Sequence, residues 1–383
     1  MNIVLVLTLF VAVLLFVERF SLQRLLNNIP LRIHVNGTRG KSSVTEYLAI
    51  ALRGSGKHPF AKITGVIPTQ IFPNGRKNEI QRRGTPRVQE QLRMIRRAVQ
   101  ERADSLVLEC MSVAPEYQKI ESQILQPHIS LLTNIRDDHF EQMGKSDEEH
   151  VEALRSALRE GSIVFTRDEE HFPQIQQYAS DRKIKAVLAP PLEEAFSKRL
   201  PSSLHADNIA LTLSVCEYLN IDKEQSFQKI IAENLELLPP VIHFTINKKI
   251  VIFHNAFTIN DVVSTNSFVE NKLTASSEVK QFIVFNTRND RPLRTQELAI
   301  WMSHLTAEPN FILCGNHSRF AERELKKNNV NQTRITIWDR ITNKDVRNFL
   351  DKESTQNIIM FGVGNIADGG FKILRCVKEI SEK

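Results

Sequence analysis

The segment 37–43, with the sequence GTRGKSS, contains the residue types that hold phosphate groups. It follows the strand-like run 32–35 and precedes a helix-like run from Val44 to Arg53. Glycine lets the backbone fold tightly around an anion, and the N–H groups at a helix N-terminus point toward it. Lys41 would contact the β- and γ-phosphates of ATP, and the Ser42 hydroxyl would bind Mg²⁺. A glycine turn before a surface helix, with Lys41 solvated, is the alternative. The residues predicted to bind ATP here are Gly37, Thr38, Arg39, Gly40, Lys41, Ser42 and Ser43.

Two further polar residues follow apolar, strand-like runs. Glu109 ends the run LVLE at 106–109, and His139 ends the segment TNIRDDH at 133–139. Ligands of open α/β sheets bind at the carboxyl ends of the strands. Glu109 could therefore ligate Mg²⁺, and His139 could hold a second metal or a phosphate. A surface glutamate and a polar loop histidine are the corresponding alternatives.

The elements that must position these residues alternate between short β-branched runs and helical stretches. This alternation predicts α/β domains with mostly parallel sheets that are covered on both faces. The segment 57–86, rich in proline and glycine, is expected to be a long loop. Strands are expected at 32–35, 106–109, 129–133, 163–165, 184–188, 250–253, 282–285, 311–314, 334–338 and 358–361, and helices at 88–102, 148–159, 206–219, 225–233, 296–303, 318–327 and 344–352.

The segment ELLPP at 236–240 interrupts the alternation, so we expect a domain boundary there. The predicted organisation is a membrane anchor at 1–28, a P-loop ATP-binding domain with a parallel sheet at 29–240, and a smaller Rossmann-like α/β domain at 241–383. The 383 residues are 42% hydrophobic and 25% charged, as in ordinary globular proteins. A net charge of +6, without a basic patch interleaved with aromatic residues, gives no reason to expect nucleic acid as a partner.

The four cysteines are widely spaced along the chain. No pair has the spacing of a zinc knuckle, and a disulfide framework is not indicated, so a reducing compartment is favoured. These cysteines are Cys110, Cys216, Cys314 and Cys376.

The N-terminal run Ile3 to Val17 carries no charge and approaches the length needed to cross the ~30 Å core of a bilayer. No basic residue precedes it and no small-residue cleavage site follows it, which argues against a cleaved signal peptide. Arg19 and Arg24 follow directly, and positive charge on this flank favours a cytoplasmic C-terminal side. We therefore expect a single anchor in the cell membrane with cytoplasmic catalytic domains; a buried N-terminal helix is the alternative.

The order of GTRGKS, LVLE and TNIRDDH resembles the Mur ligase superfamily of ATP-dependent amide ligases. The resemblance implies that Glu109 and Ser42 share a Mg²⁺ and that His139 binds a second one. It also implies that Asn208 contacts the adenine. Arg155 stands near the position of a carbamylated lysine in many relatives, and no UDP-binding domain precedes the loop, so a UDP-linked substrate is not expected.

Within that superfamily, the chain resembles the membrane-associated ligase subunits of poly-γ-glutamate synthases (PgsB/CapB type). This resemblance rests on HVNGTRGKSS at 34–43 after a short apolar segment, and on the segments 253–261, 286–292 and 362–366. Asn255 and Asp261 would contact the nucleotide when the two domains close. Arg288 and Arg291, on either side of Asp290, suit the binding of glutamate carboxylates. A surface ion-pair cluster is the alternative.

The resemblance implies an ATP- and Mg²⁺-dependent ligase that polymerises glutamate through its γ-carboxylate by way of an acyl phosphate. Lys41, Glu109 and His139 would be its catalytic residues. It further implies a growing poly-γ-glutamate product, a multi-spanning membrane subunit and an export subunit as partners. The alternatives are another amino-acid ligase of the superfamily, of the folylpolyglutamate type, and a non-catalytic nucleotide-binding subunit of an exporter.

Overall fold

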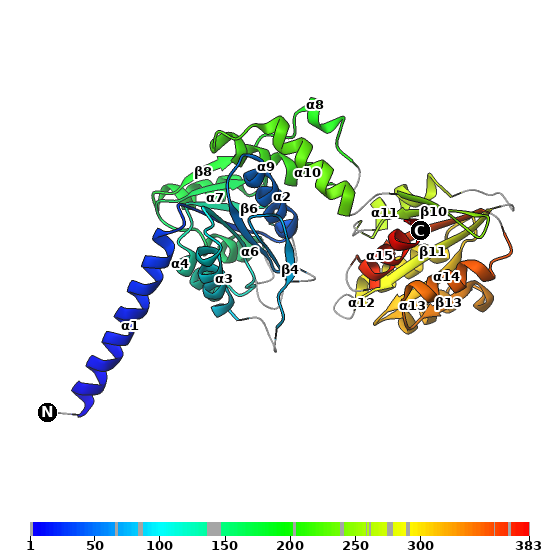
Figure 1. Ribbon diagram of the computed structural model, residues 1–383, viewed down its shortest axis with the longest axis horizontal. Helices are drawn as coiled ribbons and strands as arrows, with labels where there is room; N and C mark the ends of the chain where they lie inside the picture. Colours follow the sequence, from blue (N-terminus) through cyan, green and yellow to red (C-terminus); the bar gives the residue numbers. More distant parts are fainter. Residues whose placement is uncertain are drawn as a thin grey trace. The chain divides into compact units, whose positions relative to one another are not determined.

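The computed structural model describes residues 3–65, 68–82, 87–135, 147–201, 204–237, 241–257, 259, 262–273, 279–288, 292–355, 357–366 and 369–382. The chain forms two compact units, Met1–Ala232 and Glu233–Lys383, and each contains its own β-sheet with helices packed on it (Figure 1). The predicted α/β class is therefore confirmed. Each of the ten predicted strands overlaps a strand of the structure.

The first unit is built on an eight-stranded sheet in the order β4-β3-β2-β5-β1-β6-β7-β8. The strands from β2 to β8 in that order pair in parallel, whereas β3 and β4 are antiparallel additions. Parallel strands buried on both faces need continuous apolar runs, which explains the burial of all of β5 and β6. The strands are β1 (Leu31–Asn36), β2 (Pro59–Ile63), β3 (Thr69–Ile71), β4 (Lys77–Glu79), β5 (Ser105–Glu109), β6 (Ile129–Leu132), β7 (Ile163–Thr166) and β8 (Lys185–Leu188).

The prediction of a long loop at 57–86 is wrong. Three strands, β2, β3 and β4, lie within this segment, and β2 pairs in parallel with β5. Pro59 is the first residue of β2, a position in which a strand tolerates the missing N–H group. Phe60 and Ala61 are fully buried, so packing against β5 outweighs the local preference of proline and glycine for turns.

Helices cover both faces of the first sheet (Figure 1). The helices of this part of the chain are α1 (Ile3–Asn27), which projects away from the sheet, α2 (Lys41–Gly54), α3 (Gln89–Gln100), α4 (Pro115–Leu125), α6 (Asp147–Arg155), α7 (Phe172–Ser180), α8 (Glu194–Ser197), α9 (Ala206–Tyr218) and α10 (Lys223–Leu237), which extends into the second unit. One core cluster packs α2 and α9 against the sheet, with Val44, Leu48 and Leu211 among its members.

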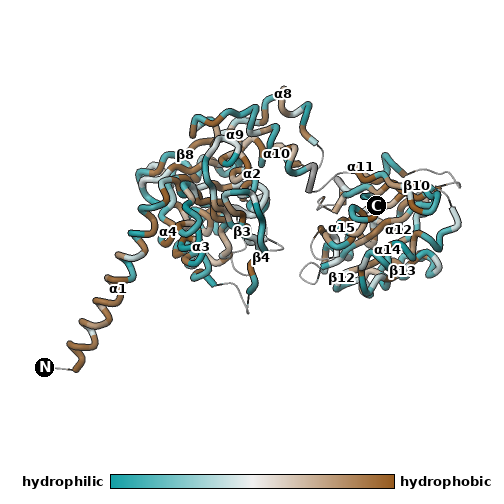
Figure 2. The backbone as a smooth tube through the Cα atoms, viewed as in Figure 1, coloured by the Kyte–Doolittle hydropathy of each residue, from teal (hydrophilic) through white to brown (hydrophobic). Residues whose placement is uncertain are grey.

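Helix α1 has two different parts. Its apolar residues from Ile3 to Val17 are exposed, and Figure 2 shows α1 as hydrophobic over most of its length. The mean hydropathy of its most apolar window is 2.6, so α1 is apolar and long enough to be a candidate membrane span. At the other end, Leu26 is fully buried in a core cluster with residues of the sheet and of α3.

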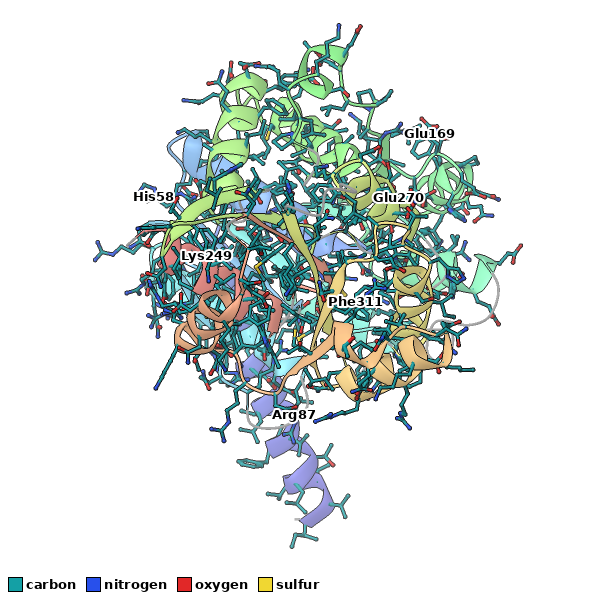
Figure 3. All side chains as sticks on the ribbon, turned by 90° about the vertical axis from the view of Figure 1, so that its right-hand side faces the viewer. His58, Arg87, Glu169, Lys249, Glu270 and Phe311 are labelled. Atoms are coloured by element: carbon teal, nitrogen blue, oxygen red, sulfur yellow. The ribbon has the colours of Figure 1, made fainter. Side chains whose placement is uncertain are left out.

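The second unit has a six-stranded sheet in the order β13-β12-β11-β14-β10-β9, in which only the β9–β10 pair is antiparallel. Phe311, on β12, is 1% exposed and lies in its core (Figure 3). Its strands are β9 (Val241–Ile246), β10 (Lys249–Asn255), β11 (Val279–Thr287), β12 (Asn310–Gly315), β13 (Ile335–Trp338) and β14 (Asn357–Gly364). Its helices are α11 (Val262–Glu270), α12 (Pro292–Ser303), α13 (Ser318–Lys327), α14 (Asn343–Lys352) and α15 (Gly369–Ser381), with a short 3₁₀ helix at Gln332–Arg334.

Candidate active site

The glycine-rich loop lies between the end of β1 and the start of α2, in the strand–loop–helix arrangement that its sequence predicts. Gly37 and Gly40 have φ angles of 123° and 84°, which L-residues with a side chain rarely adopt. A Cβ on Gly37 would lie 2.2 Å from Thr133 Oγ1, so the absence of a side chain also permits a close approach. The first N–H groups of α2, from Lys41 onward, have no acceptor within the helix and are available to an anion.

Residues that follow β6 hold this loop in place. Thr133 donates its hydroxyl hydrogen to the backbone oxygen of Arg39 at 2.6 Å. Asn134 accepts from the N–H of Arg39 at 3.1 Å and donates to the carbonyl of the same residue at 3.1 Å. The carbonyl of Asn134 accepts from the N–H of Thr38 at 2.9 Å. The TN pair of the TNIRDDH segment therefore shapes the loop, a role that sequence reasoning did not assign to it.

Lys41 bends back over the loop. Its Nζ donates to the carbonyl of Gly37 at 2.6 Å and to the carbonyl of Thr38 at 3.2 Å. The side chain is thus held above the backbone that would surround a phosphate. The predicted contact of Lys41 with the phosphates of ATP stays a prediction.

Glu109 and Ser42 lie in contact at the carboxyl end of β5. The Ser42 hydroxyl is 3.0 and 3.1 Å from the two carboxylate oxygens, and the carboxylate also accepts from the N–H of Thr64 at 2.6 Å. Glu109 is 2% exposed. A hydroxyl and a carboxylate are the hard oxygen ligands that Mg²⁺ prefers, and neighbouring oxygens around an octahedral Mg²⁺ are about 3 Å apart. The two side chains therefore fit a shared magnesium ion.

A buried polar network behind Glu109 was not predicted. Gln91, on α3, donates to the backbone oxygen of Glu109 at 3.2 Å and to the Glu121 carboxylate at 2.6 Å. Glu121, on α4, also accepts a hydrogen bond from Ser112 and lies 3.8 Å from His34 Nε2. Burial raises the pKa of the Glu121 carboxyl, but His34, Ser112 and Gln91 outweigh that effect and bring the pKa below its usual range. The network holds the end of β5, and with it Glu109, by groups far apart in sequence.

The same network continues to a buried ion pair. Lys62, on β2, is fully buried, and its Nζ lies 2.7 Å from the Glu90 carboxylate and 3.0 Å from the side-chain oxygen of Gln91. Burial lowers the pKa of Lys62, and Glu90 partly offsets this effect. Burial raises the pKa of Glu90, but Arg82 and Lys62 reverse the direction and bring it to about 2. The only sequence signal was the polar pair at 90–91 on the face of α3 that packs inward.

Asn208 is in the first turn of α9, next to the loop, where its side-chain oxygen would lie 2.5 Å from a Cβ on Gly40. Arg155, at the end of α6, forms an ion pair with Glu152, and its guanidinium lies 5.0 Å from the centre of the Tyr178 ring. His139 lies outside the described residues, so its predicted metal role stays a prediction.

In the second unit, Asn255 ends β10 and is 5% exposed, and its side-chain oxygen accepts from the N–H of Phe257 at 3.3 Å. Arg288 follows β11 and lines a small hollow together with Arg294 and Asn365. This hollow lies at the carboxyl ends of β11 and β14, where ligands of open α/β sheets bind. The remaining predicted residues of this unit, Asp261, Asp290 and Arg291, lie outside the described residues.

Comparison with known proteins places this site in a family. Residues 35–228 match the Mur ligase middle domain, and residues 241–380 match the poly-gamma-glutamate synthase CapB C-terminal domain. The fold and these matches define the class of protein, an ATP-dependent amide ligase. The chain belongs to the Mur ligase family, and its second unit has the C-terminal domain of the CapB type.

The relatives agree with this assignment. The chain is 28% identical over 284 residues to the capsule biosynthesis protein CapB of Bacillus anthracis, and the alignment covers 72% of this chain and 61% of that protein. It is 25% identical over 382 residues to the PGA synthase CapB of Bacillus subtilis (strain 168), with 96% and 95% of the two chains covered. A bifunctional folylpolyglutamate synthase/dihydrofolate synthase from Yersinia pestis, solved with AMPPNP and a Mn ion, has the same fold, with a TM-score of 0.60, 13% identity and coverage of 94% and 91%.

Proposed function

We propose that this chain is the ligase subunit of a poly-γ-glutamate synthase, which joins glutamate residues through the γ-carboxylate with hydrolysis of ATP. The observation that carries the proposal is the contact between Ser42 and Glu109 beside a glycine loop that Lys41 covers. These groups, at the carboxyl edge of a parallel sheet, would hold the phosphates of ATP and a magnesium ion. The CapB match of residues 241–380 supports glutamate as the substrate.

The loop and the first turn of α2 would bind the phosphates of ATP through backbone N–H groups, and Asn208 lies beside them as the predicted adenine contact. Ser42 and Glu109 would hold Mg²⁺, which when bound supplies positive charge to the phosphate oxygens. The AMPPNP and Mn ion of the Yersinia pestis structure support a nucleotide with a divalent metal on this fold.

The proposed reaction has two steps. A γ-carboxylate oxygen attacks the γ-phosphorus of ATP, so that an acyl phosphate forms and ADP leaves. The amine of another glutamate then attacks the acyl carbon, loses a proton, and inorganic phosphate leaves as the amide forms. Such phosphoryl transfer depends mainly on positioning and charge stabilisation, which Lys41 and the loop N–H groups provide. The buried network fixes the backbone of Glu109 through Gln91, and the N–H of Thr64 orients its carboxylate.

Arg288 would bind a glutamate carboxylate, and Asn255 would contact the nucleotide. The roles that the family resemblance gives to His139, Asp261, Asp290 and Arg291 are part of the same proposal. We also propose that α1 anchors the chain in the cell membrane with both units in the cytoplasm. Its partners would be a multi-spanning synthase subunit and an export subunit.

The test is the release of ADP and phosphate by membranes that contain this chain and its co-encoded partners, with and without glutamate. We expect glutamate to stimulate release and γ-linked glutamate polymer to accumulate. Lys41→Ala should abolish both, because it removes the cation held over the loop, while circular dichroism stays unchanged. Lys327→Ala, an exposed lysine on α13, is the matched control and should behave as wild type.

Two outcomes would redirect the proposal. ATP binding without any response to glutamate would favour the non-catalytic exporter subunit, because a gating protein has no reason to respond to an amino acid. Glutamate-dependent release that yields an adduct with another acceptor would favour a ligase of the folylpolyglutamate type. ATP consumption that is unchanged in Lys41→Ala would refute the site itself.

A further inference from the structure

A groove of about 1020 Å³ lies beside the C-terminal part of α1, on the first unit. Four basic residues line it, and all four are exposed: Arg19 on α1, Lys119 on α4, Arg159 after α6 and Arg182 after α7. The one carboxylate in the lining is Glu160. The groove therefore collects positive charge from four elements that are distant in sequence.

Little within the first unit neutralises this charge. Among the residues that the structure describes, no ion pair joins Arg19, Lys119 or Arg159 to a carboxylate. The Arg182 guanidinium lies 3.9 Å from the centre of the Tyr178 ring, a contact that orients the cation without cancelling its charge.

The carboxylate of Glu160 is itself engaged, since one of its oxygens lies 3.8 Å from Lys183 Nζ. This single carboxylate faces four cations in the lining of the groove. The polar uncharged side chains of the lining, which include Gln23, Gln123 and Gln126, leave the excess positive charge in place.

A further cation lies close to the groove. The Arg32 guanidinium donates to four backbone carbonyls, those of Leu26, Ile29, Leu125 and Gln126, and its other partner is the His128 ring. Burial lowers the pKa of both Arg32 and His128, and the charge of Arg159 lowers both further. Arg32 therefore adds positive charge here, and none of these contacts, all of them among the described residues, is with a carboxylate.

The position of the groove along α1 is also defined. Arg19 follows the apolar run by two residues, which is about 3 Å along a helix. The apolar side chains of α1 project into solvent around the helix (Figure 3). Leu26 and Ile29 are buried in the core, and Arg32 binds the carbonyls of both, so the end of α1 is fixed to the unit. If the apolar run spans a bilayer, the groove opens at the level of the lipid headgroups.

We propose that this groove binds the phosphate headgroup of an anionic phospholipid, such as phosphatidylglycerol, in the cytoplasmic leaflet. The inference rests on the membrane placement of α1 in the proposed function. Clustered Arg and Lys next to a membrane helix attract anionic lipids, and guanidinium groups bind phosphate oxygens in pairs. Bound in this way, the lipid would hold the first unit in one orientation relative to the membrane surface.

The test uses the full chain in micelles of an uncharged detergent, with lipid added and native mass spectrometry to count bound lipids. Phosphatidylglycerol should bind, and phosphatidylcholine at the same concentration should not. Lys119→Gln with Arg159→Gln should weaken phosphatidylglycerol binding about 30-fold, because each removed cation near an anionic group contributes roughly one factor of five. Both side chains are exposed, so the fold should be kept, which the circular dichroism spectrum checks.

Two matched variants complete the design. Lys119→Arg with Arg159→Lys keeps both charges and should bind like wild type. Arg323→Gln with Lys327→Gln removes two exposed cations from α13 in the second unit and should also bind like wild type. Glycerol 3-phosphate, added at the same concentration as the lipid, should not displace it. Glycerol 3-phosphate lacks the acyl chains that would pack beside the apolar run of α1.

Equal binding of the two lipids, or undiminished binding by the glutamine double variant, would overturn the proposal. Displacement by glycerol 3-phosphate would show a site for soluble anions, and displacement by γ-linked glutamate oligomers would show a site for the polymer; either result would also overturn it. The lipid assay needs neither ATP nor glutamate. If the ligase assay fails while the chain still selects phosphatidylglycerol, the proposed function alone is refuted. If the ligase assay succeeds while lipid selectivity is absent, the proposed lipid site alone is refuted. Extraction of the chain from membranes by alkaline carbonate tests the placement of α1 separately.

Discussion

Replacing Gly40 by alanine tests whether nucleotide binding depends on the backbone geometry at the end of the loop. Gly40 has a φ of 84°, a region that costs an L-residue with a side chain about 1–2 kcal/mol. The new Cβ would lie 2.5 Å from Asn208 Oδ1 and 3.0 Å from its Nδ2, so that side chain must move at a cost of about 1 kcal/mol. The sum, about 2–3 kcal/mol, predicts ATP binding that is roughly 30- to 140-fold weaker.

The assay is equilibrium titration of the purified chain with ATP and Mg²⁺, together with circular dichroism to check the fold. Asn208→Ala should remove the steric clash with the new Cβ. In a chain that already carries Asn208→Ala, the weakening of ATP binding by Gly40→Ala should therefore be about five times smaller than in the wild-type chain. Gly56→Ala is the control, since Gly56 has a φ of 85° but a Cβ there would meet no other described residue within 4 Å. It should lower stability and leave ATP affinity unchanged. Wild-type affinity in Gly40→Ala would refute the reasoning about the loop, and additive losses in the double variant would refute the contact with Asn208.

Three further predictions concern the groups around the loop. Ser42→Ala and Glu109→Gln should each lower the rate of Mg²⁺-dependent turnover at least about 100-fold. The double variant should be little slower than either single variant, because the two side chains act on one ion. A loss in the double variant equal to the two single losses multiplied together would contradict a shared site. Asn134→Ala should weaken ATP binding about tenfold in the same titration, since two hydrogen bonds to the loop are lost; unchanged binding would show that the loop is held otherwise. The pKa of Glu90 is lowered from 4.5 to about 2, so its stabilising effect is complete above pH 4.5 and is lost as the pH falls toward 2, by up to about 3 kcal/mol. Urea unfolding as a function of pH should show this dependence in wild type and lack it in Glu90→Gln, which should also be less stable at pH 7 because Lys62 stays buried without its partner.

Local patterns explain why much of the fold could be predicted from the sequence. The strand, glycine loop and helix at 31–54 are set by residues within a few positions of one another, so their order is readable without tertiary information. Central strands such as β5 and β6 were recognisable because parallel strands buried on both faces need continuous apolar runs. The contact between the loop and Glu109 also follows, because the carboxyl ends of β1 and β5 meet at one edge of the sheet.

The strands β2 to β4 show where such patterns fail. The segment around them contains prolines and glycines that locally favour turns, and β3 and β4 are only three residues long. Packing of β2 against β5, which lies more than 40 residues further along the chain, decides their conformation. The contacts of Thr133 and Asn134 with the loop likewise join residues about 95 positions apart.

The sequence by itself determined the class of the site: a lysine and a serine in a glycine loop, a strand-end carboxylate, and an apolar N-terminal run. Those are chemical identities and short-range spacings, which a linear sequence states directly. Only the tertiary structure decided how Glu109 is held, through Gln91, Glu121 and the buried Lys62–Glu90 pair, and that four separate elements bring their cations to one groove beside α1. Burial and charge depend on which distant segments pack together, and side chains that read as ordinary surface residues in the sequence acquire these roles only when the chain is folded.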